Sequence, residues 1–499
     1  MRLKKVGKLS FIAQFTLPIV ISLLFGQGLY AREKIAIIGS GLSGLTTAYE
    51  IVKGTQGDVE IDIYEGLDRV GGRTYTLRLD EGQVEAGASF INNEHTQILA
   101  MAKELGLDTT QLPGKKNRRF SYVIDGEMYS DEEIFKNLGP FFRNIEIDRL
   151  AMKENLFYFN RIEKMTVEDY LKYILIPRTA KSEKEKNLLM KIISSVMADE
   201  VGAPIENLHA LHLFDQLEID LIKNKFDPFG DTDEALKITG GNQMISEKIQ
   251  EYLEARGVRF HFKHTLEKIN IDPEGVVQLT INGESIIPSY AVITAPTNGI
   301  LEHVEISPAV KALVQRRHKM RPLGFNTKYI IQVKSEFWKN YDFPTRFMGA
   351  YYQLWNSSEG GANTFTIYFN SNALKIMKEK NLTLEALAEQ VVDEVGQFMP
   401  DFRREIVAIT PTVDWKNNPF FGGSYSGARL RGAFIQDDRM VENRLGHLFF
   451  AGEQWTNIFP GFMEGSVRSG QAVASYIQAS INTAANCQQL VHKFLINAI

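Results

Sequence analysis

The chain is poor in the residues that define several common classes of protein. It has one cysteine, Cys487, so it can form no disulfide within itself and supplies neither a cysteine-rich zinc site nor a CxxC redox pair. Its nine histidines are scattered without an HExxH or similar spacing, so no motif predicts a metal site. Lys and Arg (56) do not outnumber Asp and Glu (61), and there is no basic stripe, so we expect no nucleic-acid partner.

Glycine and proline are not in excess either. With 39 Gly and 16 Pro in 499 residues, the chain is neither collagen-like nor of low complexity. Hydrophobic residues make up 44% of it, which is too much for a disordered chain. At about 150 residues per domain, this length predicts two or three packed units.

The first 31 residues differ from the rest. Basic residues at positions 2, 4, 5 and 8 precede an uncharged stretch, 9–31, whose centre is mostly apolar. This layout is typical of a secretory signal peptide and predicts an exported protein, periplasmic or secreted. The stretch is also long enough to cross a bilayer, so an uncleaved anchor that associates the protein with a membrane is the alternative. In either case we expect the folded body to begin near Arg32.

A glycine-rich turn follows. The apolar run Ile35–Ile38 is typical of a strand buried on both faces, and residues 39–44 (GSGLSG) have the GxGxxG spacing that joins such a strand to a helix. Gly39 would make the tight turn, Gly41 would let a pyrophosphate approach the backbone, and Gly44 would let helix and strand pack closely. The positive end of the helix would face the phosphates.

A second strand ends in an acidic residue. The run Val59–Tyr64 is followed by Glu65, about 20 residues after the last glycine of the turn. A carboxylate there accepts hydrogen bonds from ribose hydroxyls and repels a 2′-phosphate, which favours FAD or NAD over NADP. Because strand, turn, helix, strand and acid fall in register, the segment predicts a dinucleotide-binding fold of the Rossmann type.

The residues after Glu65 carry a specific resemblance. Gly66 opens the stretch GLDRVGGRT, in which Gly72 precedes Arg73 and Thr74, and the guanidinium suits the same pyrophosphate. GxGxxG, a strand-end Glu and GGRT together resemble the flavin-containing amine oxidase family, which includes monoamine, polyamine and L-amino acid oxidases. The resemblance implies FAD as the cofactor, and it continues along nearly the whole chain.

Later segments resemble the same family. Residues 84–90 (VEAGASF) are similar to its loop beneath the flavin, 238–242 (ITGGN) to the start of its second cofactor segment, and 264–269 to the strand that meets adenine, here at Leu266. Residues 290–296 are similar to its strand that ends in Ala-x-Pro.

The last third of the chain carries the strongest match. An apolar strand, 447–451, precedes Gly452-Glu453, and residues 460–466 (PGFMEGS) lead into a helix through Tyr476. In the family, the positive end of this helix faces the flavin edge that becomes negative on reduction. The residues that we expect to contact FAD are Gly39, Ser40, Gly41, Leu42, Ser43, Gly44, Glu65, Gly66, Gly72, Arg73, Thr74, Gly87, Ala88, Ser89, Phe90, Leu266, Gly452, Glu453, Gly461, Phe462, Met463 and Ser466.

Lys328 is the first of three candidate catalytic residues. It lies in an apolar stretch with a K-x9-W spacing to Trp338, which resembles that of the family lysine that holds a water against flavin N5. A lysine in such a strand is costly to desolvate unless it has a partner of this kind. The alternative is a solvent-exposed lysine on an edge strand.

The other two candidates, Tyr425 and Phe462, are aromatic. They match the two walls of the family's aromatic cage, which would orient an amine and exclude water. Phe462 departs from the tyrosine pair of monoamine oxidases, which leaves the substrate class open. Ser424 stands where those enzymes attach the flavin through cysteine, so we expect FAD to be bound without a covalent link.

The resemblance implies an FAD-dependent amine oxidase. An amine between the two rings would lose hydride from its alpha carbon to the flavin, and the imine would hydrolyse to an aldehyde. O2 would then reoxidise the flavin and yield hydrogen peroxide. L-amino acid oxidases carry a substrate-binding arginine where this chain has Phe90, so we rank amines first. The alternatives are an L-amino acid oxidase, a desaturase or isomerase on the same fold, and a flavoprotein scaffold without catalysis. No pattern indicates the oligomeric state.

We therefore predict an α/β protein with two interleaved domains. The family resemblance implies a discontinuous Rossmann-type FAD-binding domain and an α+β substrate-binding domain. The first would comprise 32–90, 236–303 and 440–482, the second 91–235 and 304–439, and 483–499 would form a C-terminal helix or tail. Phe325–Val333 and Thr364–Phe369 are expected to be strands of a second sheet.

Overall fold

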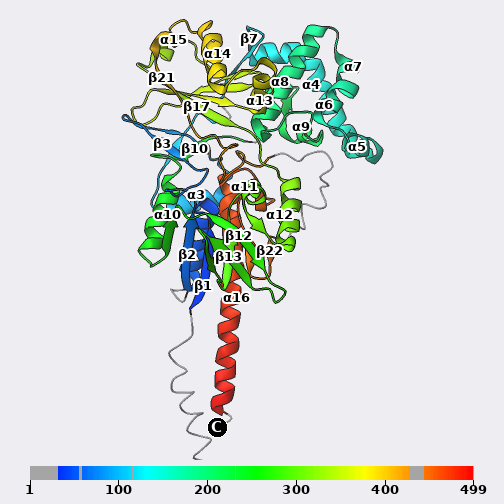
Figure 1. Ribbon diagram of the computed structural model, residues 1–499. Coiled ribbons are helices and arrows are strands. Elements are labelled where there is room, and N and C mark those ends of the chain that lie inside the picture. Colours follow the sequence, from blue (N-terminus) through cyan, green and yellow to red (C-terminus); the bar gives the residue numbers. More distant parts are fainter. Residues whose placement is uncertain (1–31, 56–58, 115–116, 231, 428–442, 498–499) are drawn as a thin grey trace, which may run out of the picture.

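A computed structural model describes residues 32–55, 59–114, 117–230, 232–427 and 443–497, with side chains as far as residue 483. The predicted signal peptide or anchor, 1–31, lies outside the described residues. Two bodies lie one above the other (Figure 1). The lower one contains residues 33–65 and 259–293 and is called the cofactor body. The upper one contains residues 120–217 and 327–411 and is called the substrate body. The predicted α/β class is confirmed.

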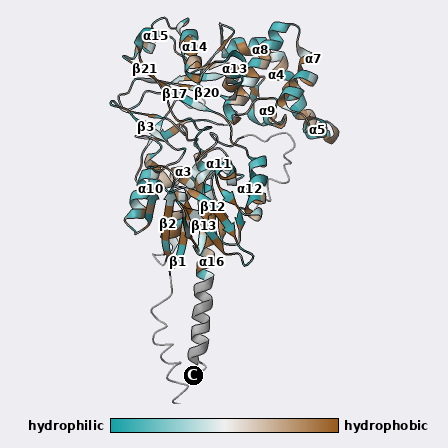
Figure 2. Cartoon of the chain, viewed as in Figure 1, coloured by the Kyte–Doolittle hydropathy of each residue, from teal (hydrophilic) through white to brown (hydrophobic). Residues whose placement is uncertain are grey.

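A six-stranded sheet forms the centre of the cofactor body. Its order is β11-β2-β1-β15-β23-β22, and all neighbours are parallel except the last pair. The strands are β1 (Glu33–Ile38), β2 (Val59–Glu65), β11 (Arg259–Phe262), β15 (Tyr290–Ile293), β22 (Arg444–Leu445) and β23 (Leu448–Phe450). Three distant stretches of chain thus share one sheet. The central strands β1, β15 and β23 are mostly apolar because both faces of the sheet are covered there, whereas β2, nearer the edge, alternates apolar and acidic residues (Figure 2).

Helices cover one face of this sheet and a smaller sheet covers the other. The helices are α2 (Leu42–Thr55), α3 (Thr96–Glu104), α10 (Met244–Glu254) and α16 (Met463–Asn497). The opposite layer consists of β12 (Leu266–Ile271), β13 (Val277–Ile281), β14 (Glu284–Ile286) and β16 (Glu305–Ile306), with α11 (Thr297–His303) and α12 (Pro308–Met320) beside them. The pairs β3 (Thr76–Arg78) with β4 (Gln83–Glu85), and β5 (Thr109–Gln111) with β10 (Leu236–Ile238), lie between the bodies.

A seven-stranded sheet forms one half of the substrate body. Its order is β21-β17-β20-β19-β18-β6-β7. The strands are β6 (Phe120–Ile124), β7 (Glu127–Ser130), β17 (Thr327–Val333), β18 (Arg346–Gly349), β19 (Tyr352–Asn356), β20 (Thr364–Phe369) and β21 (Ile406–Pro411). One face packs on α13 (Ser371–Lys380), α14 (Leu384–Gly396) and α15 (Phe402–Glu405). The two strands predicted for a second sheet are β17 and β20, which confirms that prediction.

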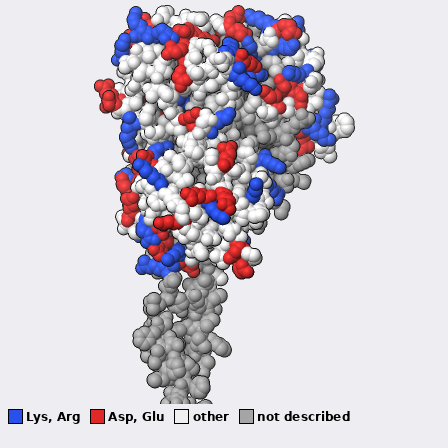
Figure 3. All heavy atoms as spheres, in the orientation of Figure 1, with Lys and Arg blue, Asp and Glu red and all other residues white. Residues whose placement is uncertain are grey.

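The other half is a helical cluster with its own apolar core. It contains α4 (Asp131–Glu154), α5 (Leu156–Ile162), α6 (Val167–Tyr170), α7 (Ile176–Thr179), α8 (Glu183–Val201) and α9 (Leu211–Gln216). The hairpin of β8 (Glu218–Asp220) and β9 (Lys225–Asp227) extends it. Lys, Arg, Asp and Glu are interspersed over the face that Figure 3 shows.

The packing differs from the predicted boundaries at two places. Helix α3 packs its Ile98 and Met101 into the core beneath the six-stranded sheet, beyond the predicted limit at residue 90. Helix α12 packs Val310 and Val314 on the other side of that sheet, beyond the predicted limit at 303. Both helices are amphipathic segments that directly follow a cofactor-body strand or loop, and no sequence signal marks which body they join. The division into domains therefore stays a proposal.

The C-terminal helix also differs from expectation. A helix through Tyr476 and a separate C-terminal helix or tail over 483–499 were expected, but α16 is continuous from Met463 to Asn497 and extends beyond the cofactor body (Figure 1). The described residues contain no helix that is both long and apolar enough to span a membrane.

Candidate active site

The glycine-rich turn joins β1 to α2, and of its three motif glycines Gly41 alone has free space where a side chain would be. Gly39 has a φ of +103°, and its N–H donates to the Tyr64 carbonyl over 2.7 Å. A Cβ on Gly44 would lie 2.1 Å from the carbonyl oxygen of Gly39, so a side chain does not fit there. Around a Cβ on Gly41, in contrast, no described atom lies within 4 Å. The start of α2 therefore presents an open backbone face of the kind that a pyrophosphate needs.

Glu65 and Gly71 flank the same turn. One carboxylate oxygen of Glu65 accepts hydrogen bonds from the backbone N–H of Ser40 (2.7 Å) and from its hydroxyl (2.8 Å). The Gly71 N–H donates to the Ser40 carbonyl over 2.9 Å, which brings residues 71–74 against the turn. His264 N–H donates to the Glu65 carbonyl over 2.8 Å, two residues before Leu266. The groups expected at the phosphates, the ribose and the adenine are thus neighbours, and they fit a dinucleotide.

Arg73 and Glu453 connect this region to the end of the chain. The guanidinium donates to a Glu453 carboxylate oxygen over 2.8 Å and to the Ser424 carbonyl over 2.7 Å. Glu453 is buried and also accepts from the backbone N–H of Ser426 (3.2 Å) and of Gly461 (2.9 Å). The protein itself therefore occupies both oxygens of Glu453, which fixes the turn before α16.

A cavity of 380 Å³ lies where the two bodies meet. The expected site residues in its wall are Arg73, Thr74, Gly87, Ala88, Ser89, Phe90, Lys328, Tyr425, Glu453, Gly461, Phe462, Met463 and Ser466. The others are not in this wall: Gly39, Ser40, Gly41, Leu42, Ser43, Gly44, Glu65, Gly66, Gly72, Leu266 and Gly452. The first set fits the reactive ring of a flavin, because the start of α16 lies in the wall, and the second set fits the nucleotide part.

The strand register of the substrate body builds the wall opposite α16. Lys328 on β17 is paired with Tyr368 on β20, which is paired with Gln353 on β19, so the three side chains share one face of the sheet. All three line the cavity. The alternate residues of the same strands, such as Tyr329 and Phe369, lie in the apolar core on the other face. The sheet thus has one face for packing and one face for the site.

Lys328 is buried, with strands on both sides, so the alternative of an exposed edge lysine is wrong. Its Nζ donates to the carbonyls of Glu85 (3.1 Å) and Gly87 (2.5 Å) and to the Ser89 hydroxyl (2.5 Å). Burial lowers the pKa of Lys328 to about 8, although the nearby Glu85 opposes the shift. Burial likewise raises the pKa of Glu85 to about 7. The lysine and the loop expected beneath the flavin therefore form one unit.

Tyr425 stands in the wall as one of two hydrogen-bonded tyrosines. Its hydroxyl lies 2.6 Å from that of Tyr368 and donates to the Asp199 carbonyl over 2.6 Å. Burial raises the pKa of both tyrosines well above the usual range, so both hydroxyls stay protonated. The ring of Phe462, which also lines the cavity, packs edge-on against His95, with centroids 5.1 Å apart. Burial lowers the pKa of His95 to about 4, so Phe462 contacts a neutral ring.

Arg346 was not expected from the sequence. This buried arginine lines the cavity with its guanidinium 4.9 Å from the Phe90 ring and 5.1 Å from the Trp355 ring. It donates to Gln353 over 2.9 Å and pairs with Glu234. An arginine therefore lies next to Phe90, although it comes from β18 rather than from the loop that carries it in L-amino acid oxidases. Arg346 is at the start of β18, where it is paired with Phe120 of β6, and no local motif marks it.

Two acidic residues at the end of α8 were also missed. Asp199 and Glu200 line the cavity in the last turn of that helix. Burial raises the pKa of Asp199 to about 7. Burial, together with Glu234 and Asp199, raises the pKa of Glu200 to about 8. The one available signal was the adjacent acidic pair at a helix end, where acids are unfavourable.

Comparison with known proteins identifies the family. The family described as flavin containing amine oxidoreductase matches residues 42–478. The chain is 24% identical over 464 residues to the flavin-containing amine oxidase B of Bos taurus, with 89% of this chain and 85% of that protein covered. It is 22% identical over 477 residues to amine oxidase A of Equus caballus, with 90% and 86% covered.

Solved structures have the same fold. Cyclohexylamine oxidase from Brevibacterium oxydans aligns with a TM-score of 0.74 at 19% identity, covering 91% of this chain and 100% of that one. A putrescine oxidase with bound putrescine aligns with a TM-score of 0.71 at 18% identity, covering 90% and 99%. Because the family match spans most of the chain, this protein belongs to the flavin-containing amine oxidoreductases, with FAD as its cofactor and amine oxidation as its reaction.

Proposed function

We propose that the enzyme oxidises a small amine in the cavity between Tyr425 and Phe462, with Lys328 as the catalytic lysine and O2 as the final electron acceptor. The observation that carries the proposal is the position of Lys328, buried in the cavity wall and bonded to the loop 85–89. Bound FAD supplies the hydride acceptor. Overall, a primary amine, O2 and water give an aldehyde, ammonia and hydrogen peroxide.

The side chains have separate tasks in this proposal. The ring of Tyr425, held by its hydrogen bonds to Tyr368 and Asp199, orients the amine from one side. Phe462, held by His95, excludes water from the other side. Lys328 would hold a water by the N–H group that otherwise donates to the Ser89 hydroxyl, and its lowered pKa of about 8 lets that group give up a proton near neutral pH.

We propose non-covalent FAD binding. The cavity residue at the expected attachment point is Ser424, whose hydroxyl lies within hydrogen-bond distance of the Gly324 carbonyl (3.0 Å) and of Asn326 Oδ1 (3.1 Å). A serine hydroxyl with two hydrogen bonds is a poor nucleophile compared with a thiol. Acid precipitation of the purified protein tests this, because FAD should appear entirely in the supernatant. Flavin that stays in the pellet would contradict the proposal.

We also propose export directed by residues 1–31, with retention of this segment as an anchor as the alternative. The basic start and the apolar stretch support it. Fractionation and amino-terminal sequencing of the mature protein test it. A soluble periplasmic or secreted form that begins near residue 32 is expected for export, an intact amino terminus in the membrane fraction for an anchor, and an intact chain in the cytoplasm would contradict both.

L-amino acids are the second candidate substrates, because Arg346 lies beside Phe90. We rank them below amines because the guanidinium of Arg346 already donates hydrogen bonds to Gln353 and Glu234. A substrate carboxylate would have to displace Glu234 and leave that acid without one of its two arginine partners, Arg346 and Arg118.

An absorbance and peroxide assay tests the proposed function. The purified enzyme is mixed anaerobically with monoamines, diamines, polyamines and L-amino acids, and the flavin spectrum is followed. Bleaching by amines, and peroxide formation once air is admitted, are expected. Bleaching by L-amino acids alone would make the enzyme an amino acid oxidase. A flavin that no compound bleaches would favour a scaffold without catalysis.

A further inference from the structure

Acidic side chains outnumber basic ones in the cavity wall. Arg73 is paired with Glu453, and Arg346 is paired with Glu234. Lys328 interacts electrostatically with the carboxyl group of Glu85. When these pairs are set aside, Asp199 and Glu200 are the charged residues of the wall that have no cationic partner among the described residues.

Asp199 carries an unused acceptor. One carboxylate oxygen accepts from the Asn370 side chain over 2.7 Å. The other, Oδ2, is buried and has no partner at normal hydrogen-bond distance among the described residues, although the side chains of Gln353 and Ser195 lie near the carboxyl group. The side chain is only 3% exposed, so water outside the cavity does not solvate it. A buried acceptor without a partner is costly, which favours a ligand that donates a hydrogen bond there.

The end of α8 adds to the negative potential. This helix spans Glu183–Val201, has no basic residue in its last turn, and ends at Gly202 in the left-handed conformation. Its last carbonyl groups give that end a partial negative charge, so two acids there repel it and each other. Natural helices usually place cations at this end. The arrangement is unfavourable for the empty protein and favourable for a bound cation.

The tyrosine pair separates these acids from Lys328. Tyr368 is paired with Lys328 across neighbouring strands, and its hydroxyl lies 3.5 Å from the Asp199 carbonyl. Tyr425 donates to the same carbonyl over 2.6 Å. A molecule whose reacting carbon lies beside Lys328 therefore has to extend past the tyrosines to reach Asp199 and Glu200.

We propose that Asp199 and Glu200 form a subsite for a second, protonated nitrogen, so that the substrates are diamines or polyamines rather than simple monoamines. This inference rests on the proposed function, because it takes the first amine to react between Tyr425 and Phe462. The groups that face Glu200 are Asp199, Glu234, Arg346, Arg118, Tyr368 and Tyr425. The arginines are neutralised by Glu234 and Asp227, which leaves the site with affinity for a cation.

The pH behaviour of the subsite follows from burial. The pKa of Glu200 is raised to about 8 by burial and by its acidic neighbours, so it is mostly protonated in the empty site at neutral pH. An ammonium group binds the ionised carboxylate. The preference for diamines over monoamines should therefore increase as Glu200 ionises, between about pH 6.5 and 8.5.

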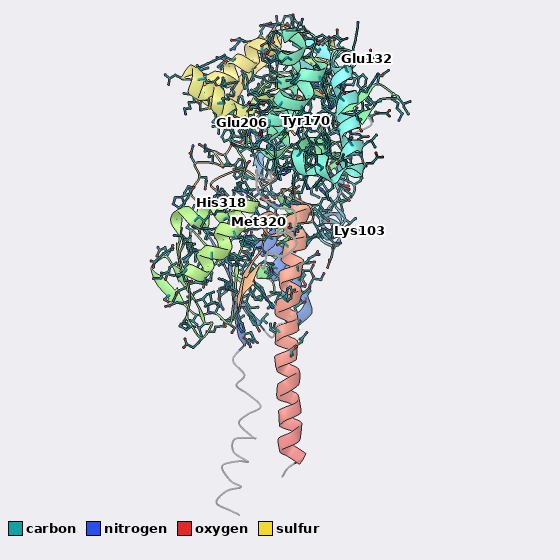
Figure 4. All side chains as sticks on the ribbon, turned by 90° about the vertical axis from the view of Figure 1, so that its right-hand side faces the viewer. Lys103, Glu132, Tyr170, Glu206, His318 and Met320 are labelled. Carbon is teal, nitrogen blue, oxygen red and sulfur yellow. The ribbon has the colours of Figure 1, made fainter. Side chains whose placement is uncertain are left out.

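Substitution of Glu200 by Gln tests the proposal. The ratio kcat/KM is measured for linear diamines and for alkyl monoamines of the same chain length, such as 1,4-diaminobutane and butylamine. Glu200→Gln should lower kcat/KM for diamines roughly tenfold or more, mainly through KM, and change monoamine values less than about twofold. The matched control is Glu206→Gln, at an exposed acid of the substrate body (Figure 4), which should change neither value.

The outcomes separate the subsite from the proposed function. If wild-type enzyme oxidises no amine, the proposed function fails and the subsite with it. If it oxidises monoamines as well as diamines, or if Glu200→Gln lowers both classes equally, the subsite alone is overturned. Should Glu200→Gln fold poorly, the wild-type ratio of diamine to monoamine kcat/KM is measured against pH. A ratio that does not rise between about pH 6.5 and 8.5 overturns the subsite.

Discussion

Lys328 is a buried cation whose three hydrogen bonds all end on residues 85–89. Met fills a similar volume without N–H donors, so Lys328→Met removes the ability to hold a water and keeps the packing. We expect FAD to stay bound while reduction or reoxidation of the flavin slows about 100-fold. Stopped-flow absorbance measures both half-reactions separately. Lys334→Met, at an exposed position of the same chain segment, is the control and should behave as wild type. Unchanged turnover in Lys328→Met would refute the role of this lysine.

The raised pKa of Glu200 predicts that the stability difference between wild type and Glu200→Gln depends on pH. Its pKa is raised to about 8 in the folded protein, so between about pH 4.5 and 8 the folded state binds more protons at this group than the unfolded state does. The group therefore destabilises the protein increasingly as pH rises through this range. Glu200→Gln lacks the group. It should equal wild type at about pH 4 and below and exceed it above pH 8 by roughly 1 to 2 kcal/mol, discounted for water in the cavity.

Thermal melts of the substrate-free enzymes at several pH values measure this difference. Glu206→Gln again serves as the control, because that exposed acid should give no trend. A Glu200→Gln variant whose melting temperature follows wild type in parallel across the range would show that Glu200 is not held protonated by its surroundings.

At the scale of elements, the turn between β1 and α2 contains one glycine that the fold requires, Gly44, and one that cofactor binding is expected to require, Gly41. A Cβ on Gly41 meets no described atom within 4 Å, whereas one on Gly44 would lie 2.1 Å from a backbone oxygen. We expect Gly41→Ala to leave the melting temperature of the FAD-free protein unchanged but to weaken FAD binding roughly tenfold. Gly44→Ala should destabilise even the FAD-free protein. Gly396→Ala, another glycine with free space around its Cβ, is the control for FAD affinity. Titration of FAD-free protein with FAD gives the affinities, and equal affinity in Gly41→Ala would contradict the expected pyrophosphate position.

Site residues in local sequence motifs can be predicted from the sequence, whereas those placed by the pairing of strands cannot. Contiguous motifs such as GxGxxG, GGRT and PGFMEGS are local, because backbone shape and helix start are set by neighbouring residues. The positions of Tyr368, Gln353 and Arg346 depend instead on register between strands, including the pairing of β17 with β20 and of β18 with the distant β6. Their strands carry aromatic and polar residues on the cavity face, so the usual alternation of apolar and polar residues does not distinguish site from core.

At the scale of the whole molecule, the sequence predicts the class of the fold better than its limits. The six-stranded sheet combines strands from three distant stretches, and each has a recognisable motif beside it. The packing of α3 and α12 depends instead on which apolar face finds which sheet, and an amphipathic pattern does not specify its partner. Arg73 and Glu453 illustrate the same limit, since their ion pair joins residues from opposite ends of the chain.

This long-range assembly predicts strong coupling between FAD binding and stability. The residues expected around FAD come from 39–74, 84–90, 266 and 452–466, and they meet only in the folded protein, so FAD binds the folded state and not the unfolded chain. At a free FAD concentration 100 times the dissociation constant, the stabilisation is about 2.7 kcal/mol. The melting temperature of FAD-free protein should therefore rise with each addition of FAD. AMP would contact only the turn, Glu65 and Leu266, so it should bind more weakly than FAD and raise the melting temperature less at equal ligand concentration. If AMP stabilised the protein as much as FAD does at equal concentration, these segments would not be joined through the cofactor.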